Sequence, residues 1–425
     1  MTKKSQVASD DRNVEHRNRR DFLRKTAALT GGAFAAGAGA APVPINPSSQ
    51  APGRGIEASV YGMPSKFEAH VARRRTDVLK NRQNWSDWSM TPLQHQPGII
   101  TPNGLVFERH HAGTPDIDPA THKLVIHGMV RQPLTFSMED LERYPTVSRF
   151  HFHECSGNGL TDWLKPASVT VQQTHGLLSG VLWTGVPASI LLDEAGIDPR
   201  GKWVLFEGGD GSAHARSVPM EKVMDDCIIA YAMNGEALRP ENGYPVRLVV
   251  PGWEGNTSVK WLRRIKVGDK PWHLRSETAR YTDPMPDGKW RQFSMVMETK
   301  SVITSPSGGM KLGKGFREVS GLAWSGSGKI RAVDVSFDGG RNWREAVLEE
   351  PVMDKCLTRF KIAWNWDGRP AVIMSRAIDS NGYVQPTVAD LAKVRAIVGF
   401  VQHHNAIQPW AVNANGEVTN VIGQA

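Results

Sequence analysis

Residues 151–159 have the sequence His-Phe-His-Glu-Cys-Ser-Gly-Asn-Gly, in which a strand-like approach runs into a turn rich in Gly and Asn. The pattern predicts that Cys155 lies just beyond the end of a strand, where open α/β sheets place their sites. The flanking His residues and Arg149 would favour its thiolate, the form that binds soft or high-valent metals. The alternative is a small buried core residue, and this is the interpretation for Cys227 and Cys356, which lie in apolar stretches without a polar turn.

Short apolar runs and helical patterns surround this stretch, from about residue 98 to residue 288. Residues 124–126 and 247–250 predict strands, whereas residues 138–144 and 188–195 predict short helices. This mixture indicates an α+β or mixed α/β domain.

The pattern changes near residue 300. Residues 330–337 alternate between apolar and polar side chains, and Asp338-Gly339-Gly340 follows them, which predicts a hairpin. Residues 371–378 predict another strand. Several short strands with turn signals over about 100 residues favour a β-sandwich. Residues 401–425 are expected to form an extended tail.

The beginning of the chain carries an export signal. Arg19-Arg20 is followed by Asp21-Phe22-Leu23, and then by an Ala/Gly-rich run that ends in Ala38-Gly39-Ala40. The pattern predicts a twin-arginine signal peptide over residues 1–40, with a disordered basic tail as the alternative. Twin-arginine export carries folded proteins to the periplasm, often because a cofactor is inserted first, so the signal already suggests a cofactor.

Composition excludes several classes of protein. The 425 residues carry a formal charge of +8, and residues 1–40 account for half of it, so the remaining excess does not favour nucleic-acid binding. Three Cys exclude a disulfide framework, and no segment is expected to span a membrane. Residues 41–97 form a Pro-rich and then charged extension, in which Arg73-Arg74-Arg75 is expected on a solvated helix face.

The fourteen His residues show none of the spacings of a zinc site, and no haem-attachment motif, Rossmann fingerprint or P-loop is present. Four basic residues lie beside loops in the same region as Cys155, and they suit an anionic or phosphate-bearing cofactor: Arg109, His111, Arg247 and Lys260. A thiolate candidate and an anion-binding set are therefore what the residues themselves indicate.

Several segments resemble motifs of the sulfite oxidase family. They are Phe107-Glu108-Arg109-His110-His111, His153-Glu154-Cys155-Ser156-Gly157-Asn158, Tyr231-Ala232-Met233-Asn234-Gly235, Asn242-Gly243-Tyr244-Pro245-Val246-Arg247, Val259-Lys260-Trp261-Leu262 and Val335-Ser336-Phe337-Asp338-Gly339-Gly340. The resemblance covers roughly residues 98–400. It implies an α+β chain with a mixed α/β molybdopterin-binding catalytic domain over residues 98–288. An immunoglobulin-like dimerisation sandwich over residues 289–400 would follow.

The resemblance also implies the site. Cys155 would be the protein's ligand to molybdenum, Arg109 would stabilise negative charge on the sulfur oxyanion, and Tyr281 would hydrogen-bond the oxo group or the substrate. The cofactor is a molybdenum–molybdopterin, with no haem in this chain. The residues implied to bind it are Phe107, Arg109, His110, His111, Asp210, Asn242, Arg247, Ser258, Val259 and Lys260. Asn242 takes the place of a pterin-contacting His.

Departures from the family pattern bear on the substrate. Gly159-Leu160 stands where sulfite-oxidising members have two arginines, and a pocket Trp is replaced near Gln173. Losing a cation weakens the binding of a small anion. Residues 251–256 and 405–410 are similar to the sulfane dehydrogenase branch of the family, whose substrate is sulfane sulfur on a carrier protein's cysteine.

The implied partners follow from that branch. They are a c-type cytochrome subunit and the sulfur carrier, around a homodimer core within a heterotetramer. Two alternatives stay open: a periplasmic sulfite:cytochrome c oxidoreductase that acts on free sulfite, and a non-catalytic binding or assembly subunit.

Overall fold

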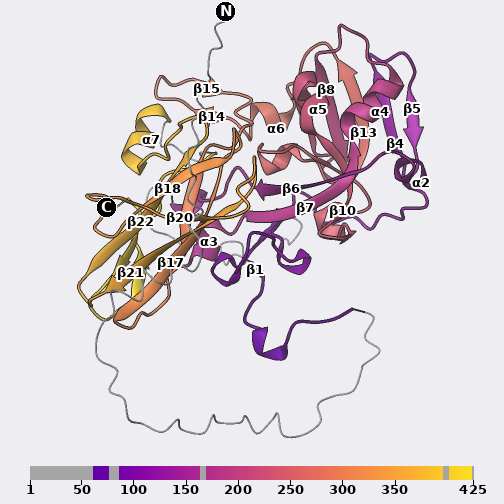
Figure 1. Ribbon diagram of the computed structural model, residues 1–425. Coiled ribbons are helices and arrows are strands. Elements are labelled where there is room, and N and C mark those ends of the chain that lie inside the picture. Colours follow the sequence, from indigo (N-terminus) through magenta and orange to yellow (C-terminus); the bar gives the residue numbers. More distant parts are fainter. Residues whose placement is uncertain (1–60, 76–85, 163–168, 396–401, 424–425) are drawn as a thin grey trace, which may run out of the picture. The chain divides into compact units, whose positions relative to one another are not determined.

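The computed structural model describes residues 61–75, 86–162, 169–395 and 402–423. The chain divides into one unit over Met1–Pro64 and a second over Ser65–Ala425. The predicted signal peptide, residues 1–40, lies outside the described residues. The second unit contains every helix and strand of the described residues (Figure 1).

The first sheet of the mixed α/β part carries Cys155 at its edge. It contains five strands, in which β6 and β7 form an antiparallel pair from Val147↔Gly185 to Glu154↔Leu178. The strands are β6 (Val147–Glu154), β7 (Leu178–Pro187), β10 (Ile228–Met233), β11 (Glu236–Ala237) and β12 (Arg247–Val249). Asn234 and Gly235 turn β10 into β11 with positive φ angles of 48° and 83°, a conformation that Asn and Gly tolerate best.

The second sheet has the order β5-β4-β13-β8-β9, and only its β4–β13 pair is parallel among the pairs described. Its strands are β4 (Leu124–Gly128), β5 (Leu134–Phe136), β8 (Trp203–Gly208), β9 (Ala215–Pro219) and β13 (Leu262–Gly268). One apolar cluster joins this sheet to α4 and α5, with Leu191, Phe206 and Ile265 almost fully buried. The expectation of a mixed α/β domain is therefore confirmed.

The helices are short. They are α2 (Met138–Glu142), α3 (Val171–His175), α4 (Ala188–Ala195), α5 (Met220–Asp226), α6 (Arg275–Thr278) and α7 (Val388–Val394). The helix predicted over 188–195 has the predicted bounds, and the one predicted over 138–144 ends two residues earlier than expected. Ser137 and Asp140 form a capping box at the start of α2. No helix in the described ranges has both the length and the apolarity needed to cross a membrane.

The second half is the predicted β-sandwich. One sheet runs β16-β17-β21-β20 and the other β19-β18-β22-β23-β24, and the two face each other in Figure 1. The strands are β16 (Lys300–Ser305), β17 (Gly315–Trp324), β18 (Ile330–Ser336), β19 (Arg344–Glu345), β20 (Val347–Glu349), β21 (Thr358–Trp366) and β22 (Ala371–Asp379). The antiparallel β18–β19 pair confirms the hairpin predicted after residue 337. A strand hairpin, β14 (Asp283–Pro284) with β15 (Trp290–Arg291), precedes the sandwich.

The C-terminal segment differs from the expectation of an extended tail. Residues after 409 form β23 (Trp410–Val412) and β24 (Val418–Asn420), which add two strands to the edge at β22. Trp410 is fully buried in the sandwich core. Burial of so large an apolar side chain stabilises this attachment, and strands of only three residues give little pattern to recognise in the sequence.

The basic run at residues 73–75 also differs from its predicted helix. Arg74–Arg75 is strand β1, which pairs with β2 (Trp88–Met90), and β2 pairs in turn with β3 (Glu108–Arg109). Arg73 lies 2.6 Å from Glu108 and 3.1 Å from Glu241. These two partly buried carboxylates hold this segment in place. Both are distant from it in sequence, so no local pattern predicts the contacts.

Candidate cofactor and active site

Cys155 follows directly after β6, as predicted. Its backbone N–H donates to Leu177 O at 3.0 Å, and Asn158 N donates to Cys155 O at 2.9 Å, closing the turn. The Asn158 side chain fastens the turn further, because its Oδ1 accepts from Leu177 N and its Nδ2 donates to Glu154 Oε1 at 2.9 Å. Gly159 ends the turn at φ +90°, where a side chain would be strained.

Cys155 as a residue is intermediate in exposure, whereas Cys227 and Cys356 are buried, as predicted. Burial raises the pKa of Cys155, and the Arg109 guanidinium opposes that shift. The cation near the thiol is therefore Arg109, and the expectation for Arg149 was wrong, since Arg149 is exposed on β6. Proximity in sequence misled here, because a strand carries a residue six positions away far from its end.

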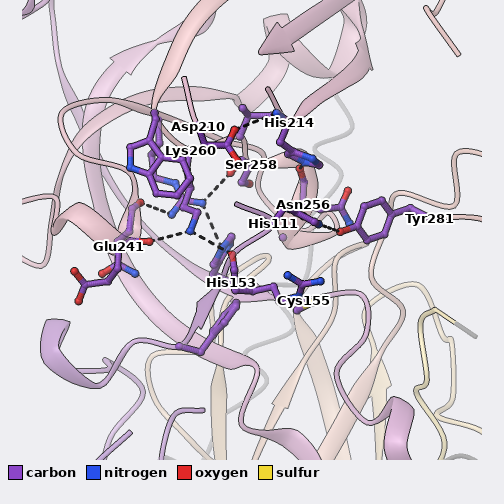
Figure 2. Close-up of a pocket in the computed structure, with 17 residues that line it drawn as sticks. His111, His153, Cys155, Asp210, His214, Glu241, Asn256, Ser258, Lys260 and Tyr281 are labelled. Carbon is purple, nitrogen blue, oxygen red and sulfur yellow. Dashed lines mark hydrogen bonds between the residues drawn. The ribbon is translucent and has the colours of Figure 1, made fainter. Parts of the chain in front are cut away.

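A pocket opens beside Cys155, with about 680 Å³ of space between its walls and at its solvent-open mouth (Figure 2). Every residue predicted for the site lines it except His110. The predicted lining residues are Phe107, Arg109, His111, Cys155, Asp210, Asn242, Arg247, Ser258, Val259, Lys260 and Tyr281. His110 lies behind Lys260, whose Nζ donates to its Nδ1 at 3.0 Å. Gln173, by contrast, belongs to the capping box at the start of α3, with Thr170. It does not line this pocket as far as the structure describes the chain.

Two buried cations form one wall. Arg247 donates to Asn242 O at 2.8 Å and to Ser258 O at 2.9 Å, and no carboxylate of the described residues pairs with it. Burial lowers the pKa of Arg247 to about 9 and, together with the Arg247 charge, that of Lys260 to about 7. The positive charge of this wall is not fully compensated by carboxylates, so the wall would bind an anion in the pocket strongly.

Three rings form another wall. His111 stacks on His214, with ring centroids 4.8 Å apart, and its Nε2 lies 2.9 Å from the Tyr281 hydroxyl. Burial lowers the pKa of His111 to about 2 and that of His214 to about 4, so both rings are neutral at physiological pH. Burial raises the pKa of Tyr281 to about 12, so its hydroxyl keeps its proton.

Sequence reasoning missed six lining residues: His153, His214, Glu241, Gly255, Asn256 and Trp261. His153 and Trp261 lie inside the motifs quoted above, so position within a motif could have found them. His214 and Asn256 meet through a 2.9 Å hydrogen bond from His214 Nε2 to Asn256 O, which joins residues 42 positions apart. No local sequence pattern predicts such a contact.

The residues present fit a molybdopterin. Asn242 Oδ1 and Asn256 Oδ1 are buried acceptors without a hydrogen-bond partner among the described residues, and a bound pterin offers N–H donors. The Arg247–Lys260 wall would hold a phosphate, and the Cys155 thiolate would bind the metal. The pocket therefore offers hydrogen-bond acceptors for the pterin, cations for the phosphate and a thiolate for the metal.

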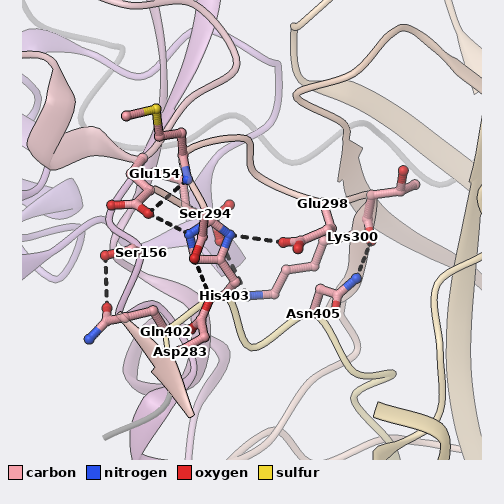
Figure 3. A network of polar contacts seen from close by, with 12 residues as sticks. Glu154, Ser156, Asp283, Ser294, Glu298, Lys300, Gln402, His403 and Asn405 are labelled. Carbon is pink, nitrogen blue, oxygen red and sulfur yellow. Dashed lines mark hydrogen bonds and ion pairs between the residues drawn. The ribbon is translucent and has the colours of Figure 1, made fainter. Parts of the chain in front are cut away.

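A buried ion pair between Lys300 and Glu154 supports the Cys155 turn (Figure 3). Lys300 Nζ lies 3.2 Å from Glu154 Oε1 and donates to Asn158 O at 3.1 Å. Trp324 Nε1 donates to Glu154 Oε2 at 2.6 Å. Because Lys300 and Trp324 belong to β16 and β17, the sandwich fixes the residue that precedes Cys155.

This fold and this site define a molybdopterin oxidoreductase, and comparisons with known proteins agree. The family model "Oxidoreductase molybdopterin binding domain" matches residues 111–275, and "Mo-co oxidoreductase dimerisation domain" matches residues 291–409. Sulfite oxidase of Gallus gallus is 32% identical over 339 residues, which cover 72% of each chain. The mitochondrial sulfite oxidase of Mus musculus is also 32% identical, and the match spans 62% of its length and 73% of this chain.

The crystal structure of the sulfane dehydrogenase SoxCD from Paracoccus pantotrophus is 47% identical to this chain. The two structures superpose with a TM-score of 0.86, and the match covers 89% of this chain and 97% of the SoxCD chain. The chain belongs to the sulfite oxidase family of molybdenum–molybdopterin oxidoreductases.

Proposed function

We propose that this chain is the molybdenum subunit of a sulfane dehydrogenase. It would oxidise sulfane sulfur held on a cysteine of a carrier protein and pass the electrons to a c-type cytochrome subunit. The 47% identity to a sulfane dehydrogenase over nearly the whole of that chain supports this proposal over its alternatives.

The charge balance beside Cys155 is the observation that carries it. Arg109 is the cation that acts on the thiol, and the next position after the turn glycine is the apolar Leu160. The buried cations Arg216 and Arg395 are already engaged by carboxylates, at Glu254 and Glu298 respectively. The other unbalanced cations of the pocket, Arg247 and Lys260, are those that would hold the cofactor's phosphate, so a free dianion such as sulfite would find little further positive charge beside Cys155. Carrier-bound sulfur needs less positive charge than a free dianion.

The residues then take the following roles. When bound, the cofactor supplies the two-electron oxidation of sulfur and the transfer of an oxygen atom derived from water. Cys155 holds the metal, and Arg109 stabilises negative charge that develops on the sulfur. The Tyr281 hydroxyl, oriented by neutral His111, donates a hydrogen bond at the same face.

The test compares substrates on protein whose molybdenum content has been measured. We expect rapid reduction of cytochrome c with a carrier protein that bears cysteine-linked sulfane, and little reduction with free sulfite. Leu160→Arg should raise the activity on sulfite. High activity of the unaltered protein on free sulfite would instead select a sulfite:cytochrome c oxidoreductase. Absence of molybdenum from properly folded protein would select a non-catalytic subunit.

Cys155→Ser tests the metal ligand itself. We expect loss of molybdenum-dependent turnover. Cys356→Ser is the matched control, because Cys356 Sγ donates to Phe150 O at 2.7 Å and a hydroxyl can make the same bond. Full turnover of Cys155→Ser would refute the assignment.

The cellular setting is part of the proposal. Residues 1–40 would direct folded export to the periplasm, and replacing Arg19 and Arg20 by Lys should leave the protein in the cytoplasm. Two sandwich chains would form the homodimer core of a heterotetramer with the cytochrome. Phe316 and Val347, which are more than half exposed on β17 and β20, support a contact there. Phe316→Asp should lower the mass measured by light scattering.

A further inference from the structure

A second buried network lies where the C-terminal segment passes the Cys155 turn (Figure 3). At its centre, His403 Nε2 lies 2.8 Å from Glu254 Oε1 and His403 Nδ1 lies 2.9 Å from Glu298 Oε2. Both ring nitrogens face carboxylates, and a His can donate from both only as an imidazolium. Burial alone would lower the pKa of His403, but Glu298 and Glu254 raise it to about 10.

Glu254 carries this contact toward the cofactor pocket. It is fully buried, and its second oxygen accepts from Asn256 Nδ2 at 2.6 Å and from Arg216 Nη1 at 3.3 Å. Arg216 in turn lies over the ring of Tyr281, 5.2 Å from its centroid. Glu254 therefore joins His403 to Asn256, which lines the pocket, and through Arg216 to Tyr281, which also lines it.

The Asn256 amide has one orientation that satisfies these contacts. Its Nδ2 donates to Glu254 and to Ser156 Oγ, which leaves Oδ1 as a buried acceptor without a partner among the described residues. Asn256 lines the cofactor pocket. The carboxylate of Glu254 thus decides that the pocket is offered an acceptor and not a donor.

The backbone around His403 holds the Cys155 turn as well. His403 N donates to Ser156 O at 2.9 Å, and Ser156 Oγ donates to Gln402 Oε1 at 2.8 Å. His403 has a φ of +55°, a left-handed conformation that a non-glycine residue adopts only where its surroundings fix it. Its backbone and both its ring nitrogens are fixed, so this residue connects the metal ligand's turn, Glu254 and Glu298.

We infer that His403 is a positioning residue of the molybdenum site. Its imidazolium locks Glu254, so that Asn256 presents Oδ1 to the bound cofactor and Arg216 stays over Tyr281, while its backbone holds Ser156 next to Cys155. The inference rests on Cys155 as the metal ligand and is independent of which sulfur compound is oxidised. Residues that orient metal ligands in this way contribute about 10–100-fold to metal affinity or activity when they are removed.

The test uses His403→Gln in the full chain, produced with the cofactor. Gln is neutral and cannot bridge both carboxylates, so Glu254 loses its contact with the imidazolium. It keeps Asn256, Arg216 and Met295 N as donors. We expect a fall of about 10–100-fold in molybdenum retention or in turnover, and altered g-values of the Mo(V) electron paramagnetic resonance signal. His403→Arg restores a cation with several donors and should recover part of both. His122→Gln is the matched control, because His122 is half-buried, hydrogen-bonds Leu262 O and touches no part of this network.

Glu298→Gln provides a second variant if His403→Gln does not fold. The Glu298 side chain is 20% exposed, and Gln keeps its shape while removing the outer carboxylate. It should change the Mo(V) signal in the same direction and by less. An unchanged signal with normal metal content in either folded variant would overturn the inference, and so would a loss of thermal stability with an unchanged signal. Because the signal is obtained by chemical reduction, the result stands even if the sulfane substrate is refuted.

Discussion

Lys300→Met should destabilise the chain more than any exposed substitution, because it removes the countercharge of Glu154. Lys300 is 2% exposed and Glu154 is not exposed at all, with 3.2 Å between Nζ and Oε1. Burial lowers the pKa of Lys300, and the Glu154 carboxylate opposes this shift. In the variant, Asn158 and Trp324 still donate to the carboxylate, but no cation remains beside it.

The expected loss is about 3–5 kcal/mol in the free energy of unfolding, the cost of leaving one partner of a buried ion pair unpaired. Removing both charges is much less costly than removing one. The double variant Glu154→Gln with Lys300→Met should therefore recover most of the loss. A double-mutant cycle gives the coupling free energy between Glu154 and Lys300.

The assay is urea unfolding of the cofactor-free protein, followed by far-ultraviolet circular dichroism. Lys289→Met is the control, since Lys289 is 83% exposed and its one ion pair among the described residues is with the exposed Asp287. Its change should therefore stay within about 0.5 kcal/mol. A loss below about 1 kcal/mol for Lys300→Met, or a double variant as unstable as the single one, would refute this reasoning.

Three further predictions concern pH, packing and cofactor binding. The pKa of His403 is raised to about 10 from 6.5, so its stabilising contribution is complete below pH 6.5 and is lost as the pH rises through 10. The difference in Tm between the wild type and His403→Gln should shrink over that range, and a constant difference would contradict this. Gly180→Ala should lose about 1–3 kcal/mol, because its new Cβ would lie 2.0 Å from Ile99 O, whereas Gly104→Ala meets nothing within 4 Å and should unfold at the same urea concentration as the wild type. Arg247→Met should lower molybdenum content by about 10-fold or more in metal analysis, and normal content would show that this wall does not hold the cofactor.

Local pattern was enough for the parts of the fold that short-range rules govern. The alternation after Ile330 and the Asp-Gly-Gly turn predicted the hairpin, and the polar turn after Phe152 placed Cys155 at a strand end. The candidate site followed from motif matches, and the structure brings those residues, except His110, to one pocket.

The remaining features depend on contacts between distant parts of the chain. His403 meets Glu254 across 149 positions, and Arg359 reaches Gln96 O across 263. The partners of a buried charge cannot be read from its neighbours in sequence, and for this reason no local pattern singles out His403. The same reason explains the C-terminal strands, whose register is set by β22 and not by their own three residues.

The attachment of the C-terminal segment also orders events in time. Ser156 and Gln402 are 246 positions apart, so a ribosome completes the Cys155 turn long before it makes the residues that close over it. Until synthesis has passed residue 403, the turn lacks the hydrogen bonds that Gln402 and His403 make with Ser156. The loop that carries Cys155 is therefore completed by the last residues of the chain to be made.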